Sequence, residues 1–258
     1  MMKGMAATTS PRRPPPPALN DDCALFLDVD GTLLEFAPQP HLAGLPDGAL
    51  ETIERLSDRL QGALALVSGR PLAQIDHLFA PLQLPAAGLH GQEFRGAPAA
   101  PRGGATALDA FKREALALAE RHPGVLVEDK GGTVALHWRN APHSAGALRD
   151  LAQAHAAQLP DYRLQPGDHV VEIVPADVDK GRALRALLAH PPFRGRRPVF
   201  VGDDLTDEYG FAAANELGGW SVLVGAREPS HASHALPDPR AVHAWLRANL
   251  ASNHGKRA

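Results

Sequence analysis

Two short apolar runs, each ending in aspartates, constrain the fold of this chain more than any other feature. The first is ALFLDVD at 24–30 and the second is PVFVGDD at 198–204. Runs of this length and composition are typical of strands buried in a parallel sheet. The carboxyl ends of parallel strands lie along one edge of the sheet, where open α/β folds bind their ligands. The sequence therefore predicts two groups of carboxylates at a ligand-binding edge.

Helices and strands alternate around both runs. After 24–30, Pro46 and Asp47 open a helix, a strand follows at 63–67, and a second helix follows at 71–79. The C-terminal part repeats this order with predicted helices near 180–190, 206–216 and 238–250 and predicted strands at 198–204 and 220–225. Such alternation is typical of a parallel sheet covered by helices.

The middle of the chain follows a different order. A helix near 106–121 precedes the hairpin VLVEDK–TVALHWR, and a helix near 142–158 precedes the hairpin YRLQ–HVVEIV. Gly131-Gly132 and Pro166-Gly167 supply the two turns. Two helices and two hairpins predict a small α+β unit with an antiparallel sheet.

The predicted fold is therefore α/β, with a parallel-sheet core into which an α+β cap is inserted. We expect a disordered, proline-rich tail at 1–20, core segments at 21–104 and 175–258, and a cap at 105–174. The linkers near 97–104 and 175–179 are the expected hinges for opening and closing of the cap.

Composition narrows the classes of partner. The 258 residues include 26 Lys and Arg against 29 Asp and Glu, a net charge of −3 that gives no reason to expect nucleic-acid or membrane-surface binding. The single cysteine, Cys23, excludes an internal disulfide framework. No apolar stretch is long enough for a transmembrane helix, and the N-terminus has no apolar signal segment. We expect a monomer in the cytoplasm that acts on a small molecule.

The aspartates favour a divalent cation. Asp28 and Asp30 are two residues apart, so an extended backbone would direct both side chains the same way. Carboxylates gathered from two strands repel one another unless a cation neutralises them, and oxygen ligands of this kind suit Mg²⁺. Helix capping or turn formation explains a single such pair equally well, but two strands that end this way make that explanation weaker.

Two further segments could face an anion. Ser68-Gly69-Arg70 ends a strand just before a helix, a place that suits phosphate, although Ser68 could simply cap the helix. Lys180 opens a helix, where the helix dipole disfavours a cation, so it is either solvated or held for an anion. Asp207 and Glu208 lie in a first helical turn, where the dipole and capping explain acids without catalysis.

These segments occur in a familiar order. DVDGT at 28–32, SGR at 68–70, DKG at 179–181 and GDDLTDE at 202–208 resemble the four motifs of the haloacid dehalogenase superfamily of phosphohydrolases. Within it, AGLHGQE at 87–93, VEDKGGTVALHWR at 127–139 and VVEIVPADVDKG at 170–181 resemble the trehalose-6-phosphate phosphatase family. The resemblance covers about residues 22–250; HWR at 137–139 departs from it, because a tyrosine is more usual there.

The resemblance implies a mechanism that fits the chemistry of these residues. Asp28 would be the nucleophile and form an aspartyl-phosphate, and Asp30 would protonate the leaving sugar oxygen and then activate water. Ser68 and Lys180 would offset the negative charge. Mg²⁺ would be held by Asp28, the backbone carbonyl of Asp30 and Asp203. Asp204 and Asp207 would support the metal site without binding the ion directly.

The resemblance also assigns the sugar to the cap. It places Glu128, Lys130 and Glu172 in sugar binding, whereas their spacing alone favours cross-strand salt bridges. Arg70 is a further substrate-binding candidate, and His90 and Arg139 are weaker ones. The implied reaction is hydrolysis of trehalose 6-phosphate to trehalose and phosphate. Alternatives are a phosphatase for another sugar phosphate, such as sucrose phosphate or mannosyl-phosphoglycerate, and an inactive sugar-phosphate sensor.

Overall fold

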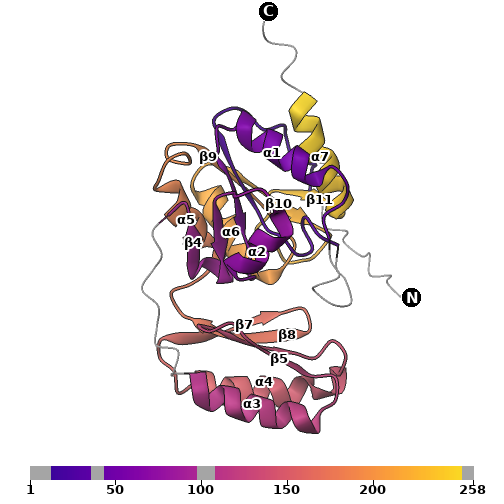
Figure 1. Ribbon diagram of the computed structural model, residues 1–258, viewed down its shortest axis with the longest axis vertical. Coiled ribbons are helices and arrows are strands. Elements are labelled where there is room, and N and C mark those ends of the chain that lie inside the picture. Colours follow the sequence, from indigo (N-terminus) through magenta and orange to yellow (C-terminus); the bar gives the residue numbers. More distant parts are fainter. Residues whose placement is uncertain (1–12, 36–43, 98–107, 252–258) are drawn as a thin grey trace, which may run out of the picture.

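A computed structural model of the chain describes residues 13–35, 44–97 and 108–251. It contains two separate β-sheets, each with its own helices (Figure 1). The first part of the expected tail, residues 1–12, and nearly all of the expected linker at 97–104 lie outside the described residues.

The larger sheet has seven strands in the order β11-β10-β9-β1-β2-β3-β4, and only the β3–β4 pair is antiparallel. Its strands are β1 (Cys23–Leu27), β2 (Leu64–Val67), β3 (Ala86–Gly88), β4 (Glu93–Arg95), β9 (Arg197–Gly202), β10 (Trp220–Val224) and β11 (His234–Leu236). Every residue of β1, β2 and β10 is buried, so helices and loops cover both faces. The helices of this part are α1 (Ala49–Arg59), α2 (Leu72–Phe79), α5 (Lys180–Leu188), α6 (Glu208–Glu216) and α7 (Pro239–Ala251).

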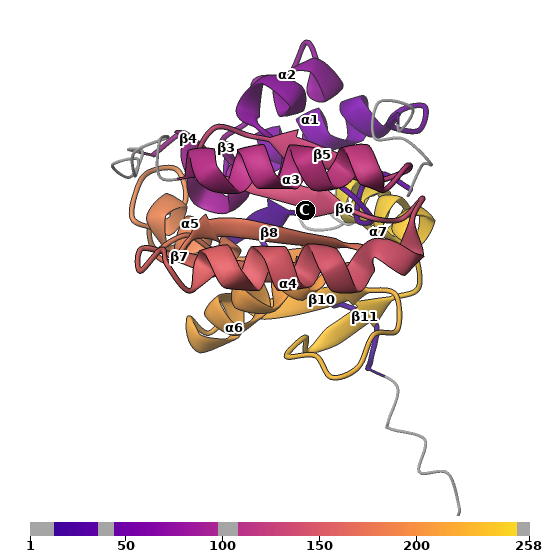
Figure 2. The ribbon, with the colours of Figure 1, turned by 90° about the horizontal axis from the view of Figure 1, so that it is seen from below.

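The smaller sheet is antiparallel, with the order β5-β6-β8-β7. Its strands are β5 (Leu126–Asp129), β6 (Val134–His137), β7 (Tyr162–Gly167) and β8 (Val170–Pro175). Helices α3 (Asp109–Arg121) and α4 (Ala145–Ala156) lie side by side on the face away from the larger sheet (Figure 2). Phe111, Leu148, Leu136 and Ile173 belong to an apolar cluster separate from that of the larger sheet. The structure thus has the predicted architecture of an α/β core with an inserted α+β cap.

The prediction of a disordered tail is wrong for residues 13–20, because these residues lie against the core. The carbonyl oxygens of Pro14 and Pro17 accept hydrogen bonds from the Ala235 N–H and the Trp245 indole. Leu19 is buried, and its N–H donates to Asn249. The sequence missed these contacts because proline-rich segments lack local periodicity, and the partners lie more than 200 residues away.

Several element boundaries also differ from the prediction. The two acidic strands end at Leu27 and Gly202, before the aspartates rather than after them. After β1 the chain turns, with the N–H groups of Leu33 and Leu34 both bonded to the Val29 carbonyl. Strands β3, β4 and β11 have three residues each, too short for an alternating pattern to reveal. None of the described helices is long and apolar enough to cross a membrane.

Candidate active site

The ends of β1 and β9 bring three carboxylates together. Asp28 follows β1, and Asp203 follows the neighbouring parallel strand β9. Asp207 lies in a single 3₁₀ turn, Leu205–Asp207, that leads into α6. One carboxylate oxygen from each of the three lies within 4.8 Å of the other two. The prediction that the acidic strand ends meet at one edge of the sheet is therefore confirmed.

Two glycines make this close approach feasible. Gly31 has φ +79°, and a Cβ there would lie 2.2 Å from an Asp203 carboxylate oxygen. A Cβ at Gly202 would lie 2.2 Å from the Asp207 carboxyl carbon. Any side chain at either position would push a carboxylate out of the cluster, so the glycines of DGT and GDD serve packing at the site.

Lys180 joins the cluster from the first residue of α5. It is buried, and its Nζ donates to Asp28 Oδ1 at 2.7 Å and to Asp207 Oδ1 at 2.6 Å. Burial alone would lower the pKa of Lys180, but the two carboxylates outweigh it and raise the pKa well above its usual range. The cation at this helix N-terminus is therefore buried and paired with two carboxylates of the protein itself, and not solvated.

The carboxylates carry more negative charge than Lys180 offsets. Burial, with Asp207 adding and Lys180 opposing, raises the pKa of Asp28 from 3.8 to about 7. Burial together with the Asp28 and Asp207 charges raises the pKa of Asp203 from 3.8 to about 9. A divalent cation would remove this penalty, and a set of carboxylate oxygens is the donor set that Mg²⁺ prefers. The residues present therefore fit Mg²⁺.

Asp30 is not one of the three clustered carboxylates, and it pairs with Arg70 instead. Its two oxygens accept hydrogen bonds from Arg70, at 2.7 Å from Nε and 2.6 Å from Nη2. Pairing with Asp30 raises the pKa of Arg70 even though burial opposes it. Strand β1 ends at Leu27, and the turn that follows begins after Val29, the residue that connects the two aspartates. The Asp30 charge contributes to the raised pKa of Asp28. That the two side chains point the same way stays a prediction.

Ser68 and Asp204 both engage nearby backbone. Ser68 is buried at the end of β2, and its Oγ accepts a hydrogen bond from the Arg70 N–H at 3.1 Å. Asp204 caps the 3₁₀ turn, where its side chain and that of Asp207 accept hydrogen bonds from each other's backbone. Asp204 thus has a capping role, whereas Ser68 does not cap α2, whose N-cap residue is Pro71.

The cap turns one polar face of its sheet toward the core. The strand register places Glu128 opposite Ala135, Ala135 opposite Glu172, and Glu172 opposite Gln165, so these side chains form one row across the sheet. Lys130 Nζ lies 2.8 Å from Glu172 and 3.7 Å from Glu128. Burial raises the pKa of Glu172, but Lys130 and His90 outweigh it and hold the pKa well below its usual range. The three cap residues therefore come together, paired with one another.

This row touches the core at two motif segments. Lys130 Nζ donates to the backbone carbonyl of Gly69 at 3.4 Å, and His90 Nε2 lies 3.4 Å from Glu172. His90 is buried with a left-handed backbone, φ +58°, a conformation that costs a residue with a side chain about 1–3 kcal/mol. The cap sheet and the loops at the carboxyl ends of β2 and β3 therefore lie in direct contact.

Comparison with known proteins identifies the family. A profile described as trehalose-phosphatase matches residues 26–240. The chain is 43% identical over 232 residues to a probable trehalose-phosphate phosphatase of Sinorhizobium fredii, with 88% of each chain covered. The chain belongs to the trehalose-phosphatase family. The trehalose-6-phosphate phosphatase of Escherichia coli is another relative, 41% identical over 240 residues, covering 89% of this chain and 87% of that one.

Solved structures agree on the fold. The C-terminal domain of Candida albicans trehalose-6-phosphate phosphatase superposes with a TM-score of 0.74 at 21% identity, covering 94% of this chain and 99% of that chain. A phosphatase of the haloalkanoate (HAD) superfamily from Bacteroides thetaiotaomicron has a TM-score of 0.59 at 15% identity, covering 95% and 97%. The predicted dehalogenase-like core with an inserted cap is confirmed, and so is the assignment to a family of phosphoric monoester hydrolases.

Three further residues make contacts at or near the site that the motifs do not predict. His137 Nε2 lies 3.0 Å from Glu128, and this contact is the largest of those that lower the pKa of Glu128. His137 lies two residues beyond Ala135 on β6, so a correct hairpin register would have placed it on the polar face. Arg227 contacts the backbone of Asp203 and Asp204 from the loop after β10, and no motif points to it. Arg139, a weak sugar candidate, pairs with Asp168 at 2.6 Å.

Proposed function

We propose that the protein is a Mg²⁺-dependent enzyme of trehalose biosynthesis that hydrolyses trehalose 6-phosphate through a phosphoryl group carried on Asp28. The observation that carries the proposal is the buried contact of 2.7 Å between Asp28 and Lys180 at the edge where β1 and β9 end. The family supplies the substrate class, since curated relatives with 43% and 41% identity are named as trehalose phosphate phosphatases.

Asp28 is suited to be the nucleophile. Lys180 donates to Oδ1, which leaves Oδ2 as the oxygen to attack phosphorus. In the first step the bond between Oδ2 and phosphorus forms while the bond between phosphorus and the sugar oxygen breaks. The Lys180 ammonium reduces the repulsion between the carboxylate and the phosphate dianion, which a carboxylate nucleophile requires. Water then attacks phosphorus and releases phosphate and free Asp28.

Asp30 and Arg70 would manage protons and charge during the reaction. Asp30 gives a proton to the leaving sugar oxygen, and in the second step it takes a proton from water. Both Asp30 oxygens now accept from Arg70, and each keeps a second lone pair that could carry the proton. An incoming phosphate competes for the guanidinium, because a planar fork binds phosphate as well as carboxylate. Substrate binding itself would then free Asp30, and Ser68 adds a hydroxyl at the same edge.

Mg²⁺ would be held by Asp28, Asp203 and the backbone carbonyl of Asp30. Asp207 suits a supporting role, because Oδ1 accepts from Lys180 and Oδ2 accepts from the N–H groups of Asp203 and Asp204. Asp204 is the other supporting residue. When bound, the ion neutralises charge on the phosphoryl group and on its carboxylate ligands.

The polar face of the cap would bind the sugar. Glu128, Lys130 and Glu172 offer charged acceptors and donors to the hydroxyl groups of a disaccharide. Because they already pair with one another and with His90 and His137, the sugar would find them held in place. Contact of this face with the core would also exclude water from the phosphoryl group.

Phosphate release from a panel of sugar phosphates, with Mg²⁺ present, tests the proposal. Trehalose 6-phosphate should be preferred over sucrose phosphate, mannosyl-phosphoglycerate and glucose 6-phosphate. A preference of about tenfold or more for any of these, about 1.4 kcal/mol, would overturn the substrate assignment. EDTA should abolish turnover and Mg²⁺ should restore it; absence of turnover on the whole panel would favour a sensor.

Replacement of the nucleophile tests the chemistry. Asp28→Asn should reduce phosphate release to roughly a thousandth or less of the wild-type rate, as expected when a nucleophile is lost. Asp58→Asn, the same change at an exposed position on α1, is the matched control and should leave the rate unchanged. Substantial turnover by Asp28→Asn would remove Asp28 from its role.

A further inference from the structure

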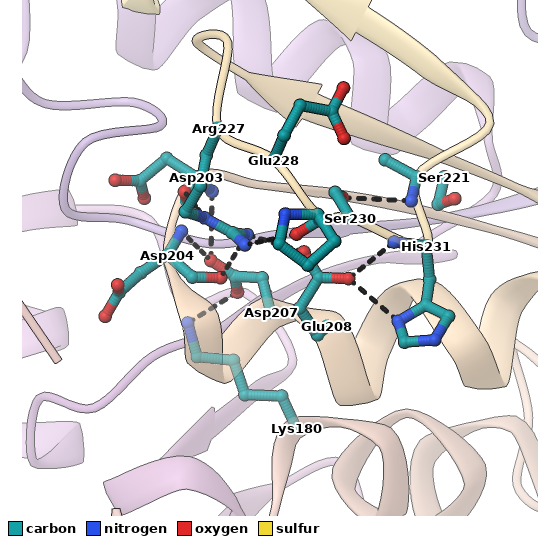
Figure 3. Close-up of polar contacts among 12 residues, drawn as sticks. Lys180, Asp203, Asp204, Asp207, Glu208, Ser221, Arg227, Glu228, Ser230 and His231 are labelled. Carbon is teal, nitrogen blue, oxygen red and sulfur yellow. Dashed lines mark hydrogen bonds and ion pairs between the residues drawn. The ribbon is translucent and has the colours of Figure 1, made fainter. Parts of the chain in front are cut away.

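Arg227 contacts the backbone of the segment that carries Asp203. It belongs to the loop that follows β10, and its guanidinium donates to two backbone carbonyl oxygens, that of Asp203 at 3.4 Å and that of Asp204 at 3.1 Å. Figure 3 shows Arg227 and Lys180 approaching the Asp203–Asp207 segment from opposite sides. None of the sequence motifs includes Arg227, and the mechanism above does not use it.

The remaining polar groups of the same backbone are bound by Asp207. The N–H groups of Asp203 and Asp204 both donate to Asp207 Oδ2 at 2.9 Å. Two charged side chains, Asp207 and Arg227, therefore hold the N–H and C=O groups of both residues. Rotation of this backbone would break charge-assisted hydrogen bonds, so the backbone is restrained and the Asp203 side chain leaves it in a set direction, on the side of Asp28.

Glu208 holds Arg227 in turn. Its Oε1 accepts from Arg227 at 2.5 Å, and its Oε2 accepts from the His231 N–H at 2.7 Å. Burial alone would raise the pKa of Glu208, but the hydrogen bonds from His231 and Arg227 outweigh it and lower the pKa. The ionised Glu208 thus ties the loop after β10 to the start of α6.

The N-terminal segment fastens the same loop from outside. Arg13 donates to the carbonyl oxygens of Ser230 at 2.8 Å and Ala232 at 2.7 Å, and it pairs with Glu228 at 2.5 Å. The loop that carries Arg227 is therefore anchored on both sides, which limits how far the guanidinium can move.

We propose that Arg227 is a positioning residue for the metal site, which orients Asp203 through two backbone carbonyls, and that Glu208 acts through Arg227. The inference rests on the Mg²⁺ requirement of the proposed function. Two effects of Arg227 on Mg²⁺ binding have opposite signs. Its positive charge repels the ion, so removing a mere spectator would tighten binding. Its hold on Asp203 favours binding, so removing a positioning residue would weaken it.

The test measures the apparent dissociation constant of Mg²⁺ from the Mg²⁺ dependence of the melting temperature, a readout that does not require turnover. Arg227→Met should raise this constant roughly tenfold, the lower end of what loss of an outer partner of a metal ligand costs. Arg227→Lys should raise it similarly, because one ammonium cannot reproduce the fork that spans both carbonyls and Glu208. Arg185→Gln removes another Arg–Glu pair, with Glu216, and should leave the constant unchanged.

Further variants keep the test decisive. Glu208→Gln preserves shape and should raise the constant roughly threefold, since a neutral hydrogen bond is about half as strong as a charged one. Glu208→Gln combined with Arg227→Met should be no worse than Arg227→Met alone, because Glu208 acts through Arg227. High Mg²⁺ should restore kcat to the Arg227 variants with the substrate KM unchanged, which general structural damage would not allow.

The outcomes separate this inference from the proposed function. If Mg²⁺ stabilises the wild type and binds Arg227→Met equally well or more tightly, the inference is overturned and the proposed function stands. If Glu208→Gln leaves the constant unchanged, Glu208 has no part in positioning. If Mg²⁺ does not stabilise even the wild type, the Mg²⁺ requirement fails and the inference falls with it.

Discussion

Ionisation of Asp28 should make the metal-free protein less stable as pH rises. The pKa of Asp28 is raised from 3.8 to about 7, chiefly because the carboxylate is buried. A pKa that is higher in the folded state favours the protonated folded form. The stability this provides is fully present below pH 3.8, the unfolded pKa, and is lost as pH rises through the folded value. The pKa of Asp203, raised to about 9, acts in the same direction.

The size of the loss follows from the shift. Each pKa unit corresponds to about 1.4 kcal/mol, and integration for Asp28 alone gives a loss of about 3 kcal/mol between about pH 5 and pH 8. Asp28→Asn cannot ionise, and it leaves Lys180 paired with Asp207. In EDTA, this variant should therefore gain about 3 kcal/mol relative to the wild type over the same pH interval.

Urea denaturation of both proteins in EDTA, at several pH values across that interval, measures the difference. Asp58→Asn on the surface of α1 should follow the wild type at every pH. Addition of Mg²⁺ should reduce the wild-type loss, because the ion favours ionised ligands. A difference between wild type and Asp28→Asn that does not change with pH would refute the reasoning that Asp28 is an uncompensated buried carboxylate.

Three further predictions concern the cap, the cluster packing and the Arg70–Asp30 pair. Glu128→Ala should reduce kcat/KM for trehalose 6-phosphate about tenfold or more beyond its effect on a small aryl phosphate, which is the scale of one charged hydrogen bond. The control Glu114→Ala on α3 should show no such difference between the substrates. Equal losses on both substrates would show that Glu128 has a structural role. Gly31→Ala should cost more stability than Gly195→Ala, because both have φ +79° but only Gly31 meets Asp203. Thermal unfolding should show about 1 kcal/mol for Gly195→Ala and about 2 kcal/mol or more for Gly31→Ala, and similar costs would contradict the close approach. Arg70→Lys keeps the charge but loses the paired hydrogen bonds to Asp30, so kcat should fall about tenfold, and an unchanged kcat would deny the pair a role.

Several features of the site could be read locally along the chain. The apolar runs before Asp28 and Asp203 predicted the parallel sheet and its acidic edge. The order of the motifs predicted the inserted cap. These signals are local because burial on both faces requires an apolar run, and turn residues mark where each run stops. Asp207 was assigned to a supporting role, which its fully engaged oxygens favour.

The pairing of charges was decided only by the tertiary structure. Lys180 meets Asp28 across 152 positions of sequence, and Arg70 meets Asp30 across 40. The sequence alone indicated no partner for Arg227 or for the residues at 13–20. Which side chains meet depends on strand order, register and the turn after β1, and these are set by the packing of the whole sheet rather than by any local pattern. The sequence by itself thus determined which chemical groups reach the site, and the fold decided how their charges are shared.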